Sequence, residues 1–121
     1  MRLNEVVYTD AHPIEGYGPG FFRIGGIRHA APLVTGPSGT APWGGYDDAE
    51  TLLPFEGNVD VLFIGTGDDI AHIPAGLRDV LEARGIGVEV MSSPAACRTY
   101  NVLLSEGRRV ALALLPVGAE S

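Results

Sequence analysis

The second half of the chain alternates strand-type and helix-type segments, and this alternation limits the fold more than any other feature of the sequence. Residues 59–64 are aliphatic apart from Asp60, as expected of a strand that is buried on both faces. Residues 88–91 are predicted to form a second strand, and residues 108–115 a third.

A predicted helix lies in each of the two intervals between these strands. The first begins at Pro74, and Gly85 follows its last residue as a C-terminal cap. The second begins with Ser93 as its N-cap and Pro94 as its first residue, and Gly107 ends it. The order from residue 59 is therefore strand, helix, strand, helix, strand.

Such a βαβαβ unit predicts an α/β domain, because helical crossovers between strands of one sheet favour parallel pairing. The final strand has an alternative, which is to pair antiparallel. The first half of the chain is expected to extend the same sheet or to pack on it.

Glycine and proline punctuate short apolar runs in the first half and predict N-terminal hairpins. Pro32 indicates a bulge or a sheet edge, because it lacks a backbone donor, and Trp43 is expected to cap the sheet. A short helix is predicted over residues 47–53, with Asp47 at its N-cap and Pro54 as its stop. The candidate strands of this half are residues 6–8, 21–24, 27–31 and 33–34.

The composition fits one domain over residues 1–121, because a chain of this length with 45% hydrophobic residues can build a core without disulfides or a metal. The formal net charge is −7 and the basic residues are scattered, so a nucleic-acid partner is not expected. No apolar run approaches the roughly 20 residues of a transmembrane helix, and no secretory signal begins the chain. These observations predict a cytoplasmic protein.

A ligand crevice is predicted where two parallel strands end, because ligands of open α/β sheets collect at the carboxyl ends of the strands. Thr66 and Asp68 follow the first buried strand, and Ser92 and Ser93 follow the second. Cys97, in the first turns of the second helix, is expected to line the same crevice, and the helix dipole and Arg98 favour a thiolate there. Its alternative role is that of a small buried hydrophobic residue.

No metal site or cofactor is predicted. His12, His29 and His72 stand far apart in the sequence and lack the close ligand neighbours of a metal-binding helix. The turn at Gly65-Thr66-Gly67 does not complete a dinucleotide fingerprint, because a third glycine is missing and the helix begins late.

Several segments together resemble a known family. They are residues 95–111 (AACRTYNVLLSEGRRVA), residues 85–90 (GIGVEV), Gly65-Thr66-Gly67, Gly16-Tyr17 and Trp43. The chain resembles the family that contains the mitochondrial complex I assembly factor and its bacterial and archaeal relatives. The resemblance implies a single compact three-layer domain with a mixed sheet and carries no catalytic residue with it. The chain shows no arginine-rich presequence, so a bacterial protein is expected.

Three functions are compatible with these patterns. The first is a non-enzymatic interaction domain, for which the resemblance implies a protein partner such as a respiratory-complex subunit or another assembly factor, and a place at the inner membrane through that partner. The second is an enzyme or small-ligand-binding protein that uses the strand-end crevice, with Cys97 as a reactive thiol. The third is a homodimer whose interface covers apolar residues of the glycine-rich half.

Overall fold

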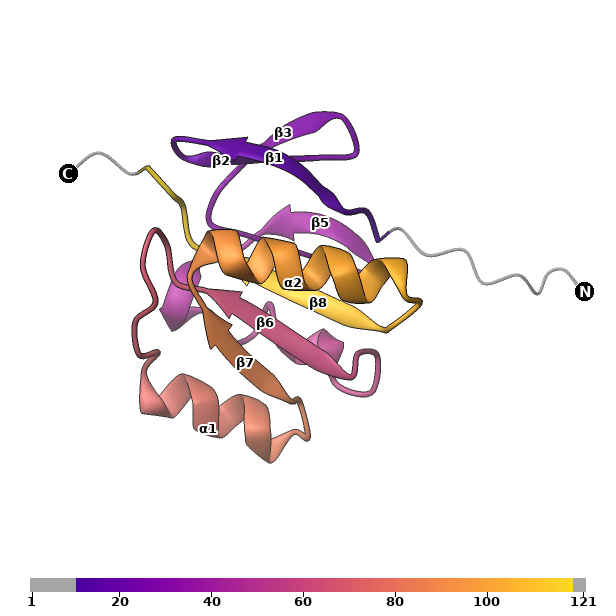
Figure 1. The fold of residues 1–121 in the computed structure, drawn as a ribbon. Helices are drawn as coiled ribbons and strands as arrows, with labels where there is room; N and C mark the ends of the chain where they lie inside the picture. Colours follow the sequence, from indigo (N-terminus) through magenta and orange to yellow (C-terminus); the bar gives the residue numbers. More distant parts are fainter. Residues whose placement is uncertain (1–10, 119–121) are drawn as a thin grey trace, which may run out of the picture.

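The structure, a computed structural model, describes residues 11–118 and forms one compact α/β unit (Figure 1). Its strands are β1 (Ile14–Gly18), β2 (Phe21–Ile24), β3 (Ile27–Ala30), β4 (Leu33–Gly36), β5 (Gly39–Pro42), β6 (Val61–Gly65), β7 (Val88–Met91) and β8 (Val110–Leu114). Its helices are α1 (Ala75–Ala83) and α2 (Ser93–Ser105), with two short 3-10 helices, η1 (Gly45–Asp47) and η2 (Leu53–Phe55). Neither α-helix has the length and apolar character required to cross a bilayer in this part of the chain.

The central sheet has the strand order β5-β4-β8-β6-β7. Strand β6 pairs in parallel with both β7 and β8, while β4 pairs antiparallel with β8 and β5. The predicted βαβαβ unit and mixed sheet are therefore confirmed, and the last strand combines the two predicted pairings, because β8 is parallel to β6 and antiparallel to β4. Parallel pairing follows from the crossover through α2, which returns the chain to the end of the sheet where β6 begins.

Two hydrophobic cores lie on the two faces of this sheet and create the predicted three layers. Successive residues of a strand point to opposite faces. Accordingly Phe63 and Leu112 pack with α2 and the small sheet β1-β2-β3, whereas Leu62 and Ile64 pack with α1 and the η segments. All five residues of β8 are buried, as expected of the central strand of a sheet that is covered on both sides.

The N-terminal half forms three hairpins, β1-β2, β2-β3 and β4-β5. Residues 21–24 are a strand as predicted, and the strand predicted over 27–31 ends one residue earlier. Gly25 and Gly26, both at positive φ (59° and 79°), form the two-residue turn between β2 and β3. Strands β1 and β5 were not among the predicted elements, and the predicted strand at 6–8 lies outside the described residues.

The helix predicted over residues 47–53 is wrong. The structure has η1 ending at the first residue of this stretch and η2 beginning at its last, because the side chain of Asp48 organises a loop in place of a helix. Its carboxylate accepts hydrogen bonds from the backbone N–H groups of Gly44 (2.9 Å) and Thr51 (3.1 Å) and from the Thr51 hydroxyl. These hydrogen bonds lower the pKa of Asp48, led by the one from the Thr51 hydroxyl.

Trp43 is buried in the core on the α1 side of the sheet, where its ring N–H donates to the backbone oxygen of Asp48 at 2.9 Å. It therefore anchors the loop after β5 to the sheet. Pro32 lies immediately before β4, with a cis peptide bond to Ala31. Its backbone oxygen accepts a hydrogen bond from the backbone N–H of Trp43 at 3.1 Å.

Candidate functional site

The carboxyl ends of the parallel strands meet at one end of the sheet, as the sequence predicts for a ligand crevice. Three backbone hydrogen bonds hold these ends together. Thr66 N–H donates to Met91 C=O at 2.9 Å, Ser93 N–H to Gly67 C=O at 2.7 Å, and Leu115 N–H to Gly65 C=O at 3.0 Å. The residues that follow β6, β7 and β8 are thus in direct contact.

Ser93 is the centre of this junction and is fully buried. Its hydroxyl accepts a hydrogen bond from Gly67 N–H at 2.9 Å and donates one to Leu115 C=O at 2.8 Å. Gly65 approaches so closely that a Cβ at that position would lie 2.7 Å from the Ser93 Oγ. Ser93 therefore joins three chain segments with a single hydroxyl group.

Thr66 and Asp68 also bond to the main chain. The Thr66 hydroxyl donates to Asp69 C=O at 2.7 Å and lies 3.2 Å from Met91 C=O, and it accepts from Ala71 N–H at 3.1 Å. The Asp68 carboxylate accepts from Gly118 N–H at 2.9 Å. Both side chains fix the loop after β6 in place.

Ser92, rather than the predicted Ser93, caps helix α2, and its hydroxyl accepts from Ala95 N–H at 3.3 Å. The structure thus brings Thr66, Asp68, Ser92 and Ser93 to one end of the sheet. Each of these four side chains already has a main-chain partner, so this end is held together mainly by its own polar groups. Ligand binding by these residues stays a prediction.

Cys97 lies apart from this junction, on the face of α2 that packs against β1. It is 4% exposed, and burial raises the pKa of its thiol to about 12 in spite of the nearby Arg98. A thiol with such a pKa is overwhelmingly protonated at neutral pH, which disfavours a nucleophilic role. The geometry fits the alternative role of a small buried hydrophobic residue.

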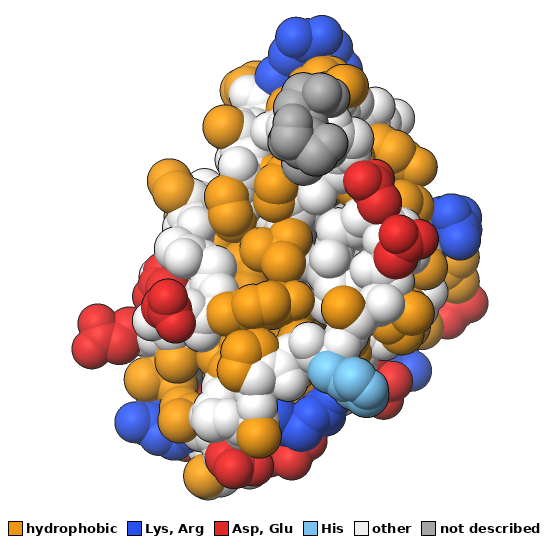
Figure 2. Space-filling model, turned by 90° about the vertical axis from the view of Figure 1, so that its left-hand side faces the viewer, with side chains coloured by type: hydrophobic (Ala, Val, Ile, Leu, Met, Phe, Trp, Pro, Cys, Tyr) orange, Lys and Arg blue, Asp and Glu red, His pale blue; other side chains and the backbone are white. Residues whose placement is uncertain are grey.

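The same end of the molecule presents an apolar surface. Figure 2 looks at this end and shows hydrophobic side chains gathered in its middle, with acidic side chains on both sides. Half-buried Ala31, Pro32 and Leu115 and exposed Pro42 lie at this end of strands β4, β8 and β5. Next to them, a hollow of about 380 Å³ opens between the end of β3 and strand β5, with Trp43 in its wall. Such a surface suits a protein partner better than a small polar substrate.

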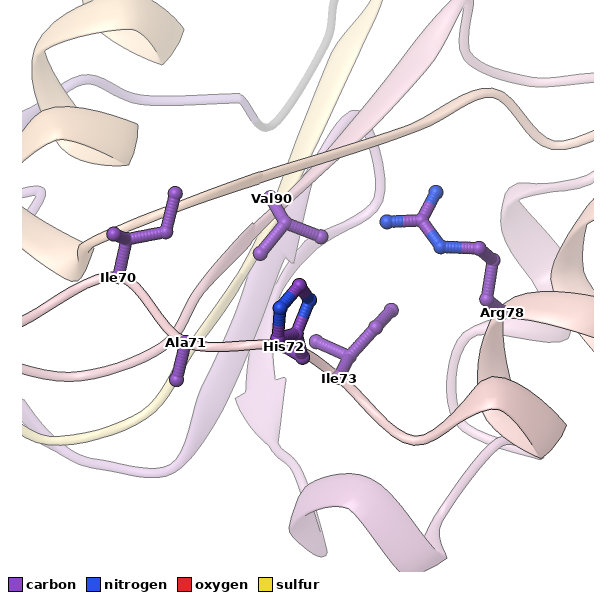
Figure 3. A pocket seen from close by; sticks show the side chains of 6 residues that line it. All are labelled: Ile70, Ala71, His72, Ile73, Arg78 and Val90. Carbon is purple, nitrogen blue, oxygen red and sulfur yellow. The ribbon is translucent and has the colours of Figure 1, made fainter.

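A second hollow lies beside the edge strand β7 and was not predicted from the sequence. It has a volume of about 260 Å³ and is lined by Ile70, Ala71, His72, Ile73, Arg78 and Val90. Figure 3 shows His72 and Ile73 pointing from the loop before α1 toward a space that Val90 and Arg78 border on the other sides. The sequence signal for this hollow is Ile70, a large apolar residue in a loop, and its side chain is 66% exposed.

The charged groups of the described surface form scattered pairs. Arg84 pairs with Glu56 at 3.2 Å, and Arg109 pairs with Asp60 at 3.0 Å. All four side chains are largely exposed, so each pair contributes little to stability. Within residues 11–118, no three His, Cys, Asp or Glu side chains lie close enough together to hold a metal ion.

Comparison with known proteins identifies relatives along nearly the whole chain. Residues 14–115 match the family described as "Protein of unknown function (DUF498/DUF598)". An uncharacterized protein of Rhodobacter capsulatus is 51% identical over 97% of this chain and 94% of its own length. The zebrafish (Danio rerio) NADH dehydrogenase [ubiquinone] 1 alpha subcomplex assembly factor 3 is 37% identical over 89% of this chain, but this chain spans only 66% of that protein.

Solved structures of the same fold exist. A crystal structure described as an outer membrane protein of Bartonella henselae superposes with a TM-score of 0.80 and 35% identity, over 91% of this chain and 99% of that one. The solution structure of a Bordetella pertussis protein, described as a Mth938-like domain, gives a TM-score of 0.72 with 29% identity over 96% of this chain and 92% of that one. The α/β architecture is therefore shared with proteins of independently determined structure.

Proposed function

The chain belongs to the family described as "Protein of unknown function (DUF498/DUF598)", and from this membership we propose that it is a non-enzymatic interaction domain that serves in the assembly of a respiratory NADH dehydrogenase. The observation that carries the proposal is the similarity to animal NADH dehydrogenase assembly factors, which covers 89% of this chain in the zebrafish protein and 85% in the human one.

Two structural observations support an interaction role. The polar side chains at the carboxyl ends of the strands form hydrogen bonds with the main chain. The surface beside them is apolar and consists of rigid prolines and small residues. A preformed apolar surface of this kind loses little conformational entropy when a partner covers it.

The test is deletion of the gene in its own organism, followed by measurement of the assembled NADH dehydrogenase in membranes by native electrophoresis and by NADH:quinone reductase activity. We expect both to fall, and we expect a plasmid copy of the gene to restore them. Succinate dehydrogenase in the same membranes is the control and should not change. Wild-type levels of NADH dehydrogenase in the deletion strain would refute the proposal.

The proposed location is the cytoplasm of a bacterium, with attachment to the inner membrane through the partner. The 51% identity to a Rhodobacter protein supports the bacterial assignment. Fractionation of cells that carry a tagged copy tests the location: the protein should be recovered from the soluble fraction and from membranes that release it in high salt. Recovery only after detergent extraction would contradict this location.

The alternative function is an enzyme or ligand-binding protein that uses the strand-end crevice. It is favoured by one observation, the convergence of Thr66, Asp68, Ser92 and Ser93, while Cys97 lies apart. Alkylation of Cys97 in the folded protein tests the reactive-thiol part of this alternative, because a reactive thiol would be modified at neutral pH and a buried one only after unfolding. Light scattering tests the third reading, a homodimer.

A further inference from the structure

We propose that the outer edge of β7 binds an extended segment of a partner protein in which apolar residues alternate with basic residues. This inference rests on the proposed interaction function and names the surface and the chemistry of the partner. It combines an unpaired strand edge, an adjacent apolar hollow and an acidic side chain.

The main chain of β7 is open on its outer side. Leu62 N–H donates to Gly87 C=O at 2.8 Å, and Thr66 N–H donates to Met91 C=O at 2.9 Å. Because backbone groups of alternate residues point to opposite sides of a strand, Gly87 and Met91 face β6, whereas Val88 and Val90 turn their N–H and C=O groups away from it. β7 is the last strand of the sheet, so no strand of the described chain lies on that side.

The other edge of the central sheet is protected. The backbone N–H of Trp43 donates to Pro32 C=O just beyond the paired residues of β4 and β5, so the backbone groups of Trp43 face β4. Because these groups alternate along a strand, the backbone nitrogen of the preceding residue, Pro42, faces outward. Proline has no N–H to offer at that position. In the small sheet, the edge of β1 is occupied by Asn101, whose side chain bonds the N–H of Ile14 at 2.8 Å and its C=O at 2.9 Å.

The hollow beside β7 provides a place for a side chain of the incoming segment. Val90 and buried Ile73 form apolar walls, and Arg78 borders the opening (Figure 3). The guanidinium of Arg78 is already paired with Glu82 at 3.2 Å, so the hollow does not present a free positive charge. An apolar side chain suits this environment better than a carboxylate.

Charge selects the alternate residues of the incoming segment. Glu89 is exposed and is aligned with Phe63, which packs on the α2 side of the sheet, so it lies on the face opposite Val90. A residue of the incoming segment that faces Glu89 is therefore favoured when it is basic. The overall net charge of −7 favours the same choice. Pairing of β7 with a second copy of itself would bring two Glu89 side chains close together, which is unfavourable.

The test uses a synthetic peptide of alternating valine and lysine, blocked at both ends, and a matched peptide of valine and glutamate. Fluorescence anisotropy with the folded full chain measures binding, and amide chemical shifts locate it. We expect the lysine peptide to bind and the glutamate peptide not to bind. The largest shifts should fall on Val88, Val90 and the loop residues 70–73.

Two variants probe the charge and the hollow separately. Glu89→Arg should weaken binding of the lysine peptide about three- to tenfold, because an attractive cross-strand pair becomes a repulsive one. Its control, Glu106→Arg, makes the same change of net charge at an exposed site on the end of α2 and should leave binding unchanged. His72→Trp should fill the hollow and weaken binding by a similar factor, whereas Val102→Trp on exposed α2 should not.

Equal binding of both peptides, shifts centred elsewhere, or an equal loss in Glu106→Arg would overturn the proposal, as would dimerisation through β7.

Experiments in cells distinguish the β7 surface from the assembly role. A deletion strain that lacks NADH dehydrogenase but is fully rescued by Glu89→Arg would refute the β7 surface and leave the assembly role intact. Peptide binding at β7 in a protein whose deletion has no respiratory effect would leave the surface and refute the role.

Discussion

Substitution Ser93→Ala tests whether the polar groups at the strand ends serve stability. The change removes one hydroxyl that accepts from buried Gly67 N–H and donates to half-buried Leu115 C=O. A buried group left without a partner costs about 1–3 kcal/mol, and the cost is lower for the carbonyl that water can reach. We therefore expect the free energy of unfolding to fall by about 2–4 kcal/mol.

The assay is urea unfolding at neutral pH, followed by the fluorescence of Trp43, which is the only tryptophan of the chain and is buried. With a urea dependence of about 1–3 kcal/mol/M for a small domain, the midpoint should fall by roughly 0.7–4 M at unchanged slope. Ser105→Ala is the matched control on the same helix, because its hydroxyl is exposed and bonds only Val102 C=O. A loss in Ser93→Ala no larger than in this control would refute the structural reading of the junction.

Three further predictions concern other parts of the core. Burial raises the pKa of Cys97 to about 12 from an ordinary value of 9.0, so the contribution of the buried thiol to stability is complete below pH 9 and is lost as the pH rises toward 12. Urea unfolding at pH 7 and pH 10.5 should show this loss of stability, and Cys97→Ser should make the loss smaller. Asn101→Ala should cost about 1–3 kcal/mol and speed hydrogen exchange in β1, whereas exposed Val102→Ala should do neither. Gly65→Ala should cost about 1–3 kcal/mol in the same unfolding assay, because the new methyl group would meet backbone and side-chain atoms at 2.7–2.8 Å.

The elements that the sequence predicts best are those with their own local signals. The aliphatic run before Gly65 and the strand at residues 88–91 require no partner to be identified, and the second of these has the predicted bounds. The strand β1 (IEGYG) has weak intrinsic strand character, and it exists because β2 pairs with it on one side and Asn101 bonds it on the other. Such long-range support has no signature in the local sequence.

The candidate site shows the same division. The sequence predicts correctly that residues 66–68 and 92–93 meet, because they follow adjacent parallel strands. It does not predict that each hydroxyl there already has a main-chain partner. A hydrogen bond forms only when donor and acceptor are positioned to within a few tenths of an ångström, and here the positions depend on how three strands pack together. The hollow beside β7 was missed for a related reason: its walls come from a loop, a helix and a strand that only the fold brings together.

The central position of β8 has a consequence for synthesis of the chain on the ribosome. Strand β8 is the last of the described strands to be translated, yet it alone links β4 to β6. Until residues 110–114 have left the exit tunnel, the nascent polypeptide holds two separate halves of the sheet with uncovered aliphatic faces. Final consolidation of the domain must therefore follow, and cannot accompany, most of its translation.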